Sequence, residues 1–364
     1  MAAIRDTDDP LLAVLRAPRH MATLGEVQWS AVLHRARPIG LLSRLAVLAD
    51  DAGVIDALPA AVRRHLRWGR IEGAENARLF GWEVNRVRRA LAPLDVPIVL
   101  LKGVAYQQAG LDAGRGRIST DLDVMVPFDR LDACEAALKA GGWQSVKSND
   151  YDDRYYRRWM HELPPLRHAD RHTVVDLHHT ILPRTARLKP DAAALIAEAV
   201  PLDGGPTRVL APADMVLHSA VHLVEDSDFG GRLRDLVDID ALVREFATRD
   251  GFWDTLVERA RLHGLTGPLW HTLTLAQRLL GTDLSDAVAT RLAPLKPAAP
   301  GRLCLQGLGA RSLLSGGYGR QYTTRAGRLA QWLLYLRSHW RRMPPALLAW
   351  HLAVKAWFRV TGRA

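Results

Sequence analysis

Residues 96–101 have the sequence VPIVLL, residues 121–126 have DLDVMV, and residues 173–179 have TVVDLHH. The first is an apolar run of strand length, the second alternates in polarity, and the third is rich in β-branched residues, as strands are. An amphipathic helical pattern at residues 129–140 lies between the last two and is ended by two glycines. Strands that alternate with helices over so short a span predict a small α/β domain.

The sequence on either side has helical periodicity. The N-terminal part carries apolar residues at helical spacing, with a break near Pro38 and an end at Pro93. After the strands, helices are expected at residues 212–224 and 233–246. The chain is therefore predicted to have four parts: a helical region at 1–92, the α/β domain at 93–183, a helical domain at 184–300 and a basic tail rich in Trp and Arg at 301–364.

The tail contains no Asp or Glu, so the chain's net charge of +10 belongs mainly to it. Its arginines are interleaved with large apolar residues, and residues 316–319, GGYG, predict a linker near its start. A basic helix with tryptophans can bind an anionic membrane surface, and arginines beside aromatic residues can bind single-stranded nucleic acid. The alternative is that the tail packs on the body of the protein.

Cysteine usage and hydropathy narrow the class of protein. The two cysteines form no CxxC pair, so neither a disulfide framework nor a cysteine zinc site is expected. The N-terminus is acidic and polar, unlike a signal peptide, and no apolar run approaches the roughly 18–20 residues of a transmembrane helix. We therefore expect a cytoplasmic protein with no transmembrane segment.

Three aspartates carry the candidate chemistry. Asp121 and Asp123 alternate along one strand, so their carboxylates share a face and repel each other, a conflict that a divalent cation removes. Asp176 lies in an otherwise apolar strand, where a carboxylate needs a partner or a metal. Carboxylates from two strands suit a two-metal site for phosphoryl transfer, for which Mg²⁺ is the usual ion. The alternative is an exposed strand with solvated acids.

Groups suited to phosphate binding precede these acids. Lys102 and Gly103 follow a strand and begin a helix, where a glycine lets a phosphate approach the backbone and the helix N-terminus favours an anion. Arg117 and Ser119 lie in the loop directly before Asp121. Cationic, hydroxyl and carboxylate groups are thus expected at one end of the strands.

The combination of LKGVAYQQAG at residues 101–110, RISTDLDVMV at 117–126 and VVDLHH at 174–179 resembles the uncharacterised nucleotidyltransferase family of polymerase-beta-like enzymes. The similarity extends more loosely to residues 211–223 and 232–239. It implies an α+β fold in which a small mixed-sheet nucleotidyltransferase domain is flanked by helical regions. One departure concerns the phosphate turn, where the wider superfamily usually has Gly-Ser or Gly-Gly and this chain has Lys102-Gly103.

The resemblance implies Mg²⁺-dependent transfer of a nucleoside monophosphate from an NTP to a hydroxyl group, with release of pyrophosphate; Mn²⁺ is an alternative ion. Carried over by position, Asp121 and Asp123 would bind both ions, and Asp176 would be the third ligand and the base toward the acceptor hydroxyl. The nucleotide would be bound by Lys102, Gly103, Arg117 and Ser119.

Members of this family occur beside lasso-peptide biosynthesis genes, which implies a peptide or small-molecule acceptor. A toxin-type nucleotidyltransferase acting on tRNA is the first alternative. A non-catalytic relative that binds a peptide or ligand is the second, although such a protein has little need for three acids.

Other polar residues are open to two interpretations. Five histidines lie at residues 161–179, but without cysteines or a clear ligand spacing a zinc site is the less favoured interpretation. His178 shares a strand face with Asp176 and is expected on the acceptor side of the site, with a packed histidine as the alternative. The pair His218 and His222 is expected at a helix–helix contact. Interhelical ion pairs, or an acceptor cleft, are expected for Arg234, Asp235 and Asp238.

Overall fold

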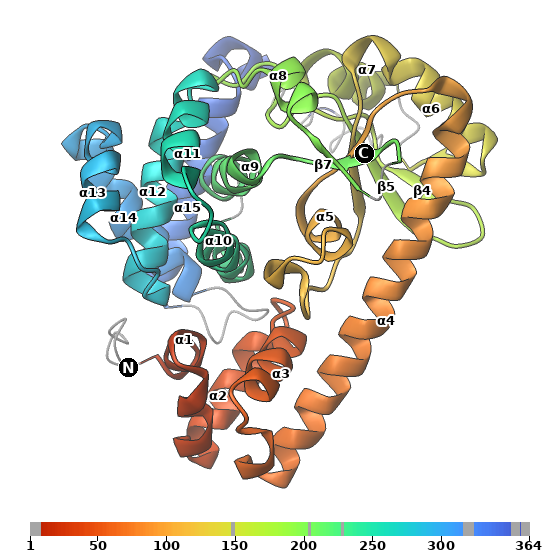
Figure 1. Ribbon diagram of the computed structural model, residues 1–364. Coiled ribbons are helices and arrows are strands. Elements are labelled where there is room, and N and C mark those ends of the chain that lie inside the picture. The colour runs from red at the N-terminus through yellow and green to blue at the C-terminus, as the bar shows by residue number, and fades with distance from the viewer. Residues whose placement is uncertain are drawn as a thin grey trace.

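The structure is a computed structural model that describes residues 9–146, 150–202, 205–226, 229–315, 324–350 and 357. It has the expected α+β class, with one mixed sheet and helices on both sides of it along the chain. Figure 1 shows three groups of elements: the sheet with α5–α8, the N-terminal helices α1–α3, and the stacked helices α9–α15. The long helix α4 runs from the N-terminal helices to the sheet.

The sheet has seven strands in the order β3-β4-β5-β2-β1-β7-β6. Strands β1 and β7 are parallel, as are β2 and β5, and the other neighbours are antiparallel. The central strands β1 and β2 are buried along their whole length, which explains their apolar sequences. The bounds are β1 Ile98–Leu100, β2 Leu122–Met125, β3 Trp143–Ser145, β4 Leu166–His168, β5 Val174–His178, β6 Val200–Pro201 and β7 Thr207–Val209.

The helices before and within the sheet region agree with the apolar spacing of the sequence. A break at Pro38 separates α2 from α3, as expected, and α4 ends next to Pro93. The bounds are α1 Pro10–Arg16, α2 Glu26–Ala36, α3 Leu42–Asp51, α4 Ala60–Leu91, α5 Lys102–Gln108, α6 Leu131–Ala140, α7 Asp150–Trp159 and α8 Ala192–Ala197. Short 3-10 helices are η1 Pro18–Thr23, η2 Ile55–Ala57, η3 Ala92–Leu94, η4 Asp112–Gly114 and η5 Phe128–Arg130.

The C-terminal helices pack around α9, which is buried on nearly all sides by α10, α11 and α12. The predicted helix at residues 233–246 coincides with α10. The bounds are α9 Pro212–Glu225, α10 Leu233–Phe246, α11 Phe252–Leu262, α12 Thr266–Leu280, α13 Asp286–Leu292, η6 Ala293–Leu295, α14 Ala299–Leu314 and α15 Arg325–Arg342. The predicted linker at 316–319 lies outside the described residues.

Residues 143–146 also predict a strand, and β3 lies there. Three other strands and one helix were not expected from the sequence. Residues 184–300 were predicted to be helical, yet β6 and β7 lie there and extend the sheet beyond β1. Strand β4 and helix α7 were also missed. These strands have two or three residues each, too few for an alternating pattern to show. The four-part division of the chain stays a prediction.

Close packing of α3 on α4 depends on glycine. A Cβ atom at Gly73 would lie 2.0 Å from the Ser43 hydroxyl, and one at Gly69 would lie 2.9 Å from a side-chain carbon of Leu42. Both distances are shorter than van der Waals contact, so only glycine allows the two helices to approach this closely. The same contact places Ser43 and Glu72 at the wall of the large cavity described below.

The tail helix α15 packs on α14 and α9 through one face, on which Ala330, Leu334 and Ser338 are buried. At its C-terminal end Arg337 and Arg341 both pair with Glu225, whose carboxylate is only 5% exposed. The described part of the tail therefore packs on the body and also continues into a helical segment at residues 345–350.

A chain truncated before Arg325 should be clearly less stable than the full chain. Truncation uncovers the apolar surface of α14 and α9 on which Ala330 and Leu334 pack, and it removes the two arginines that pair with Glu225. Full burial of one large apolar side chain contributes about 1.5–3 kcal/mol. The melting temperature of the two chains measures the effect. Trp332→Ala, on the exposed face of α15, is the control and should melt like the full chain. Equal melting temperatures for the truncated and full chains would contradict this role of α15.

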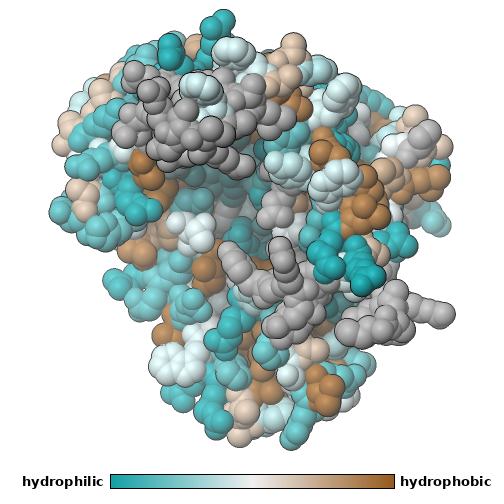
Figure 2. Space-filling view, turned by 180° about the vertical axis from the view of Figure 1, so that it is seen from behind, coloured by the Kyte–Doolittle hydropathy of each residue, from teal (hydrophilic) through white to brown (hydrophobic). Residues whose placement is uncertain are grey.

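Among the described residues, no helix has both the length and the apolarity that crossing a membrane requires. Seen from behind, the surface carries its hydrophobic residues in separate small patches among hydrophilic ones (Figure 2).

Candidate active site

The three aspartates meet at one cavity because β2 and β5 are parallel neighbours. In their register Asp123 lies directly opposite Asp176, so the two carboxylates stand side by side on the same face of the sheet. Asp121 directly precedes β2 and lies on the same side as Asp123. All three line a cavity of about 980 Å³ between the sheet, α4, α9 and α10. The structure thus brings together the acids that the sequence singles out.

Of the three aspartates, Asp123 has the closest contacts with basic side chains. Its Oδ1 atom lies 2.8 Å from the Lys102 ammonium and 2.8 Å from Nε2 of His178. Burial alone would raise the pKa of this carboxyl group, but the adjacent Lys102 and His178 hold the pKa well below its usual range. Asp123 is therefore ionised throughout the physiological pH range.

Among the residues that the structure describes, Asp121 and Asp176 have no such cationic partner. Burial, followed by repulsion from Asp123, raises the pKa of Asp121. Burial, followed by repulsion from Glu162 and Asp123, raises the pKa of Asp176 to about 7. Oδ1 of Asp176 is buried and has no hydrogen-bond partner among the described residues.

These carboxylates fit a divalent metal ion. Asp121, Asp123, Asp176 and Glu162 face the cavity, and Lys102 is the one lysine among its lining residues. Oxygen ligands of this kind, with one oxygen left unpaired, are what Mg²⁺ takes from proteins. The raised pKa values of Asp121 and Asp176 indicate that a positive charge bound between these carboxyl groups would stabilise their ionised forms.

Lys102 and Gly103 stand where β1 passes into α5. The amide of Leu101 donates to the carbonyl of Asp123 at 3.0 Å, which fixes the end of β1 beside the acids. Lys102 has a positive φ of 52°, an uncommon conformation for a residue other than glycine. A Cβ atom at Gly103 would lie 2.9 Å from the Ser119 hydroxyl, so the glycine lets the loop before β2 approach α5.

That loop is fixed by a residue the sequence did not indicate. Asn76 of α4 accepts a hydrogen bond from the Ser119 amide at 2.8 Å and donates one to the Ser119 carbonyl at 2.8 Å. The Ser119 hydroxyl is buried and has no hydrogen-bond partner among the described residues. This paired contact orients the loop while its hydroxyl stays available to a bound molecule.

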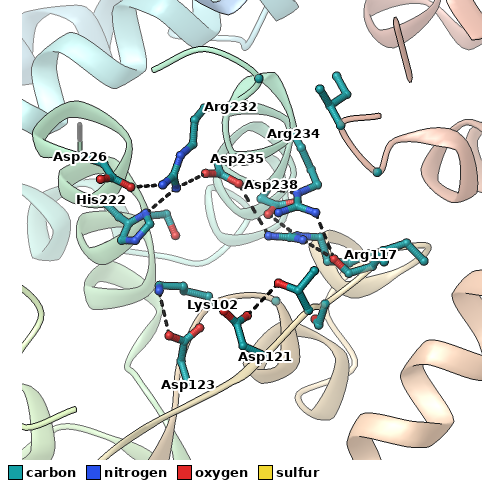
Figure 3. A pocket seen from close by; sticks show the side chains of 18 of the residues that line it. Lys102, Arg117, Asp121, Asp123, His222, Asp226, Arg232, Arg234, Asp235 and Asp238 are labelled. Atoms are coloured by element: carbon teal, nitrogen blue, oxygen red, sulfur yellow. Dashed lines mark hydrogen bonds and ion pairs between the residues drawn. The ribbon is translucent and has the colours of Figure 1, made fainter. Parts of the chain in front are cut away.

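Arg117 faces the cavity but is held by α10. Its Nε atom donates to Asp238 at 2.6 Å, and a terminal nitrogen lies 3.7 Å from Asp235. Figure 3 shows this arginine between the two aspartates of α10 and the loop before β2. Interhelical ion pairs were expected for Asp235 and Asp238, but their contacts with Arg117 join α10 to a loop, and both acids also line the cavity. The role of Arg117 toward a nucleotide stays a prediction.

The wall opposite the acids is rich in arginine. Arg232 pairs with Asp226 and Asp235, and a terminal nitrogen of Arg234 donates to the Ile118 carbonyl at 3.2 Å (Figure 3). Arg342 of α15 pairs with Asp226 at 2.6 Å and also lines the cavity. Sequence reasoning did not place Arg342 or Glu162 at the site, because both reach it only through tertiary packing.

The predicted acceptor-side residue His178 lies beneath the acids and is 1% exposed. Besides Asp123, its Nε2 atom has Glu162 at 3.3 Å. Burial lowers the pKa of a histidine, but the hydrogen bond to Asp123 and the charge of Glu162 raise the pKa of His178 above its usual value. The other expected pair, His218 and His222, makes an edge-to-face ring contact within α9, and His222 also lines the cavity.

The chain thus has a small mixed sheet between helical regions, with one large cavity lined by acids and arginines. Residues 25–281, more than half of the chain, match the family described as uncharacterised nucleotidyltransferase. The chain belongs to that family, which confirms the resemblance of residues 96–179. No curated protein matches the chain. The match ends at the close of α12, so the tail residue Arg342 lies outside it.

Proposed function

We propose that the chain is a Mg²⁺-dependent nucleotidyltransferase that moves a nucleoside monophosphate from an NTP to a hydroxyl of a peptide or small-molecule acceptor, with release of pyrophosphate. The observation that carries the proposal is the placement of Asp121, Asp123 and Asp176 on adjacent parallel strands at one large cavity. Family membership supports the NTP as substrate. The arginines on the opposite wall suit a triphosphate.

Each residue has a role that follows from its position. Asp121, Asp123 and Asp176 would hold the metal ions. Mg²⁺, or Mn²⁺ in its place, supplies positive charge to the phosphate oxygens and makes the acceptor hydroxyl more acidic when it is bound. Lys102 can exchange its bond with Asp123 for one with a phosphate, and the unpaired Ser119 hydroxyl can donate to another phosphate oxygen. Gly103 and Arg117 complete that side of the cavity.

Asp176 is the group proposed to receive the acceptor's proton. The acceptor oxygen forms a bond to the α-phosphorus, the bond to pyrophosphate breaks, and the hydroxyl proton passes to the Asp176 carboxylate. Bound Mg²⁺ would keep the Asp176 carboxylate ionised and therefore able to receive the proton. His178 would act on the acceptor side indirectly, through the carboxylates that it contacts.

The test combines an acceptor-independent measurement with a search for products. Thermal stabilisation by Mg²⁺ with each NTP measures nucleotide binding without knowledge of the acceptor. Mass spectrometry of peptide, metabolite and tRNA pools incubated with enzyme, Mg²⁺ and each NTP then identifies the product. A nucleotide on tRNA would favour the toxin-type alternative. Binding of NTP with no product in any pool would favour a non-catalytic relative, and no NTP binding would contradict the proposal.

Mg²⁺ should stabilise the protein more at about pH 8 than at about pH 6. The pKa of Asp176 is raised from 3.8 to about 7, so the folded metal-free protein carries an extra proton between these values and loses stability as the pH rises through them. Mg²⁺ needs the ionised carboxylate, so its binding strengthens over the same window. Melting temperatures with and without Mg²⁺ measure the difference. Asp176→Asn should flatten it, and an equal shift at both pH values in the wild type would contradict this assignment.

A second surface is proposed for the tail. Its helix α15 carries an exposed apolar face with arginines beside it, formed by Leu329, Trp332, Leu333, Leu336 and Trp340. A face of this kind supports contact with an anionic membrane surface, and nucleic acid is the alternative partner. Co-sedimentation with anionic and with uncharged vesicles, and titration with single-stranded DNA, separate the two.

A further inference from the structure

Three side chains beside the catalytic acids have the arrangement of a second kind of metal site. Nε2 of His161 lies 3.6 Å from Oε2 of Glu162, and Nε2 of His178 lies 3.3 Å from the same oxygen. The three donor atoms all lie within 4.8 Å of one another. A zinc site among the histidines at residues 161–179 was the less favoured interpretation of the sequence, which did not single out Glu162.

The distances fit tetrahedral coordination. Zinc binds imidazole nitrogen and carboxylate oxygen at about 2.0–2.2 Å, and the donor atoms at the corners of such a tetrahedron are about 3.3–3.6 Å apart. Both contacts of Glu162 fall in this range. The fourth corner is left to a water molecule or a bound ligand, because the group of donor atoms that lie within 4.8 Å of one another contains three residues.

Backbone hydrogen bonds hold the donors in place before any ion binds. Glu162 and His178 form an antiparallel β-bridge, the Leu163 amide donates to the Leu177 carbonyl at 2.9 Å, and the His179 amide donates to the His161 carbonyl at 2.9 Å. The segment that carries His161 and Glu162 is thus attached to β5 like an additional strand. Ligands on rigid elements need little reorganisation, which favours binding.

Glu162 also lacks a permanent cationic partner. Within the part of the chain that the structure describes, its carboxylate has ion-pair contacts only with His161 and His178, which are charged only when protonated. The Glu162 side chain is 19% exposed and the His161 side chain 13% exposed, and both line the cavity, so an ion can reach them. A partly buried carboxylate between two imidazoles is a typical ligand set for a transition metal.

We propose that His161, Glu162 and His178 bind a divalent transition-metal ion of the zinc type, with water or a bound ligand in the fourth position. This ion is distinct from the Mg²⁺ proposed for the aspartates, because Mg²⁺ prefers oxygen ligands and imidazole nitrogen favours zinc and its neighbours.

The test measures zinc binding in the tag-free full chain and needs no acceptor. The protein is stripped with a chelator, equilibrated with Zn²⁺ in a large excess of Mg²⁺, dialysed, and its metal content determined. About one Zn²⁺ per chain should remain, and His161→Ala and Glu162→Gln should each weaken binding by at least about 10–100-fold. His20→Ala, which removes an exposed histidine of η1, is the matched control and should retain the ion.

Two further measurements keep the result independent of folding and of nucleotidyl transfer. Circular dichroism checks that the variants are folded, and Co²⁺ in place of Zn²⁺ should give the visible absorption of a tetrahedral site in the wild type only. No retained Zn²⁺ in the folded wild type, or equal retention in the folded variants, would overturn the proposal. Neither result would contradict the proposal that the aspartates bind Mg²⁺. Conversely, an absence of nucleotidyl transfer would not contradict a measured zinc site.

Discussion

Asp123→Asn should lower nucleotidyl transfer by about 10³-fold or more while the chain remains folded. Asn keeps the size of the side chain and one oxygen for Lys102 and His178, so the packing around this position is retained. It removes the negative charge that the proposed metal ions share. Metal ions contribute several kcal/mol to charge stabilisation in the transition state, and each 1.4 kcal/mol corresponds to a factor of ten.

The measurement is the rate of pyrophosphate release at saturating NTP and Mg²⁺, together with the thermal shift that NTP causes. Both should fall in the variant. Asp129→Asn is the matched control, because Asp129 is exposed on η5 just beyond the same strand and should behave as the wild type. A folded Asp123→Asn protein with unchanged activity would remove this residue from the site.

Asp176→Asn should lower turnover by about 10²-fold or more, the scale of losing a general base, and should change NTP affinity only a few-fold. The carboxylates of Asp123 and Asp176 are neighbours across β2 and β5, yet their surroundings differ. Asp123 is paired with Lys102 on the side proposed for the phosphates, whereas Asp176 has a buried oxygen without a partner and a pKa of about 7. The surroundings of Asp123 suit the binding of a charged group, and those of Asp176 suit proton transfer.

Single-turnover kinetics beside isothermal titration with a non-hydrolysable NTP separate the two effects. Asp121→Asn is the comparison, since it should lose metal-dependent nucleotide affinity. The proposed division of roles is wrong if Asp176→Asn loses affinity as severely as Asp121→Asn. Turnover within about twofold of the wild type would show that Asp176 takes no part in the chemistry.

Much of the sheet, and the strand segments that bring the three aspartates to one cavity, could be predicted from the sequence. The runs at 96–101, 121–126 and 173–179 are β1, β2 and β5, because buried central strands require continuous or alternating apolar residues. Because these strands were expected in one small sheet, their acids were expected to lie close together. The parallel register that sets Asp123 against Asp176 is a tertiary property, and no local pattern contains it.

The residues that sequence reasoning missed share one physical feature. Three such residues are Asn76, Glu162 and Arg342. The sequence around each one either shows only the apolar spacing of a packed helix or is too short to show a periodic spacing. Asn76 lies on the polar side of an amphipathic helix, where an amide is ordinary, and its role appears only when the Ser119 loop lies against it. When functional residues lie singly on helices and strands that are far apart in the sequence, no regular spacing in the sequence connects them.

The position of Arg342 has a consequence for protein synthesis. The chain is made from its N-terminus, at roughly 5–20 residues per second, so Asp123 exists roughly 10–40 s before the ribosome reaches Arg342. Until then the sheet can form with its acids in place, but the wall that α15 contributes to the cavity is missing. A product of premature termination within α15 would therefore carry every aspartate of the site without the enclosure around them. The enclosed cavity can therefore form only after the ribosome has passed Arg342.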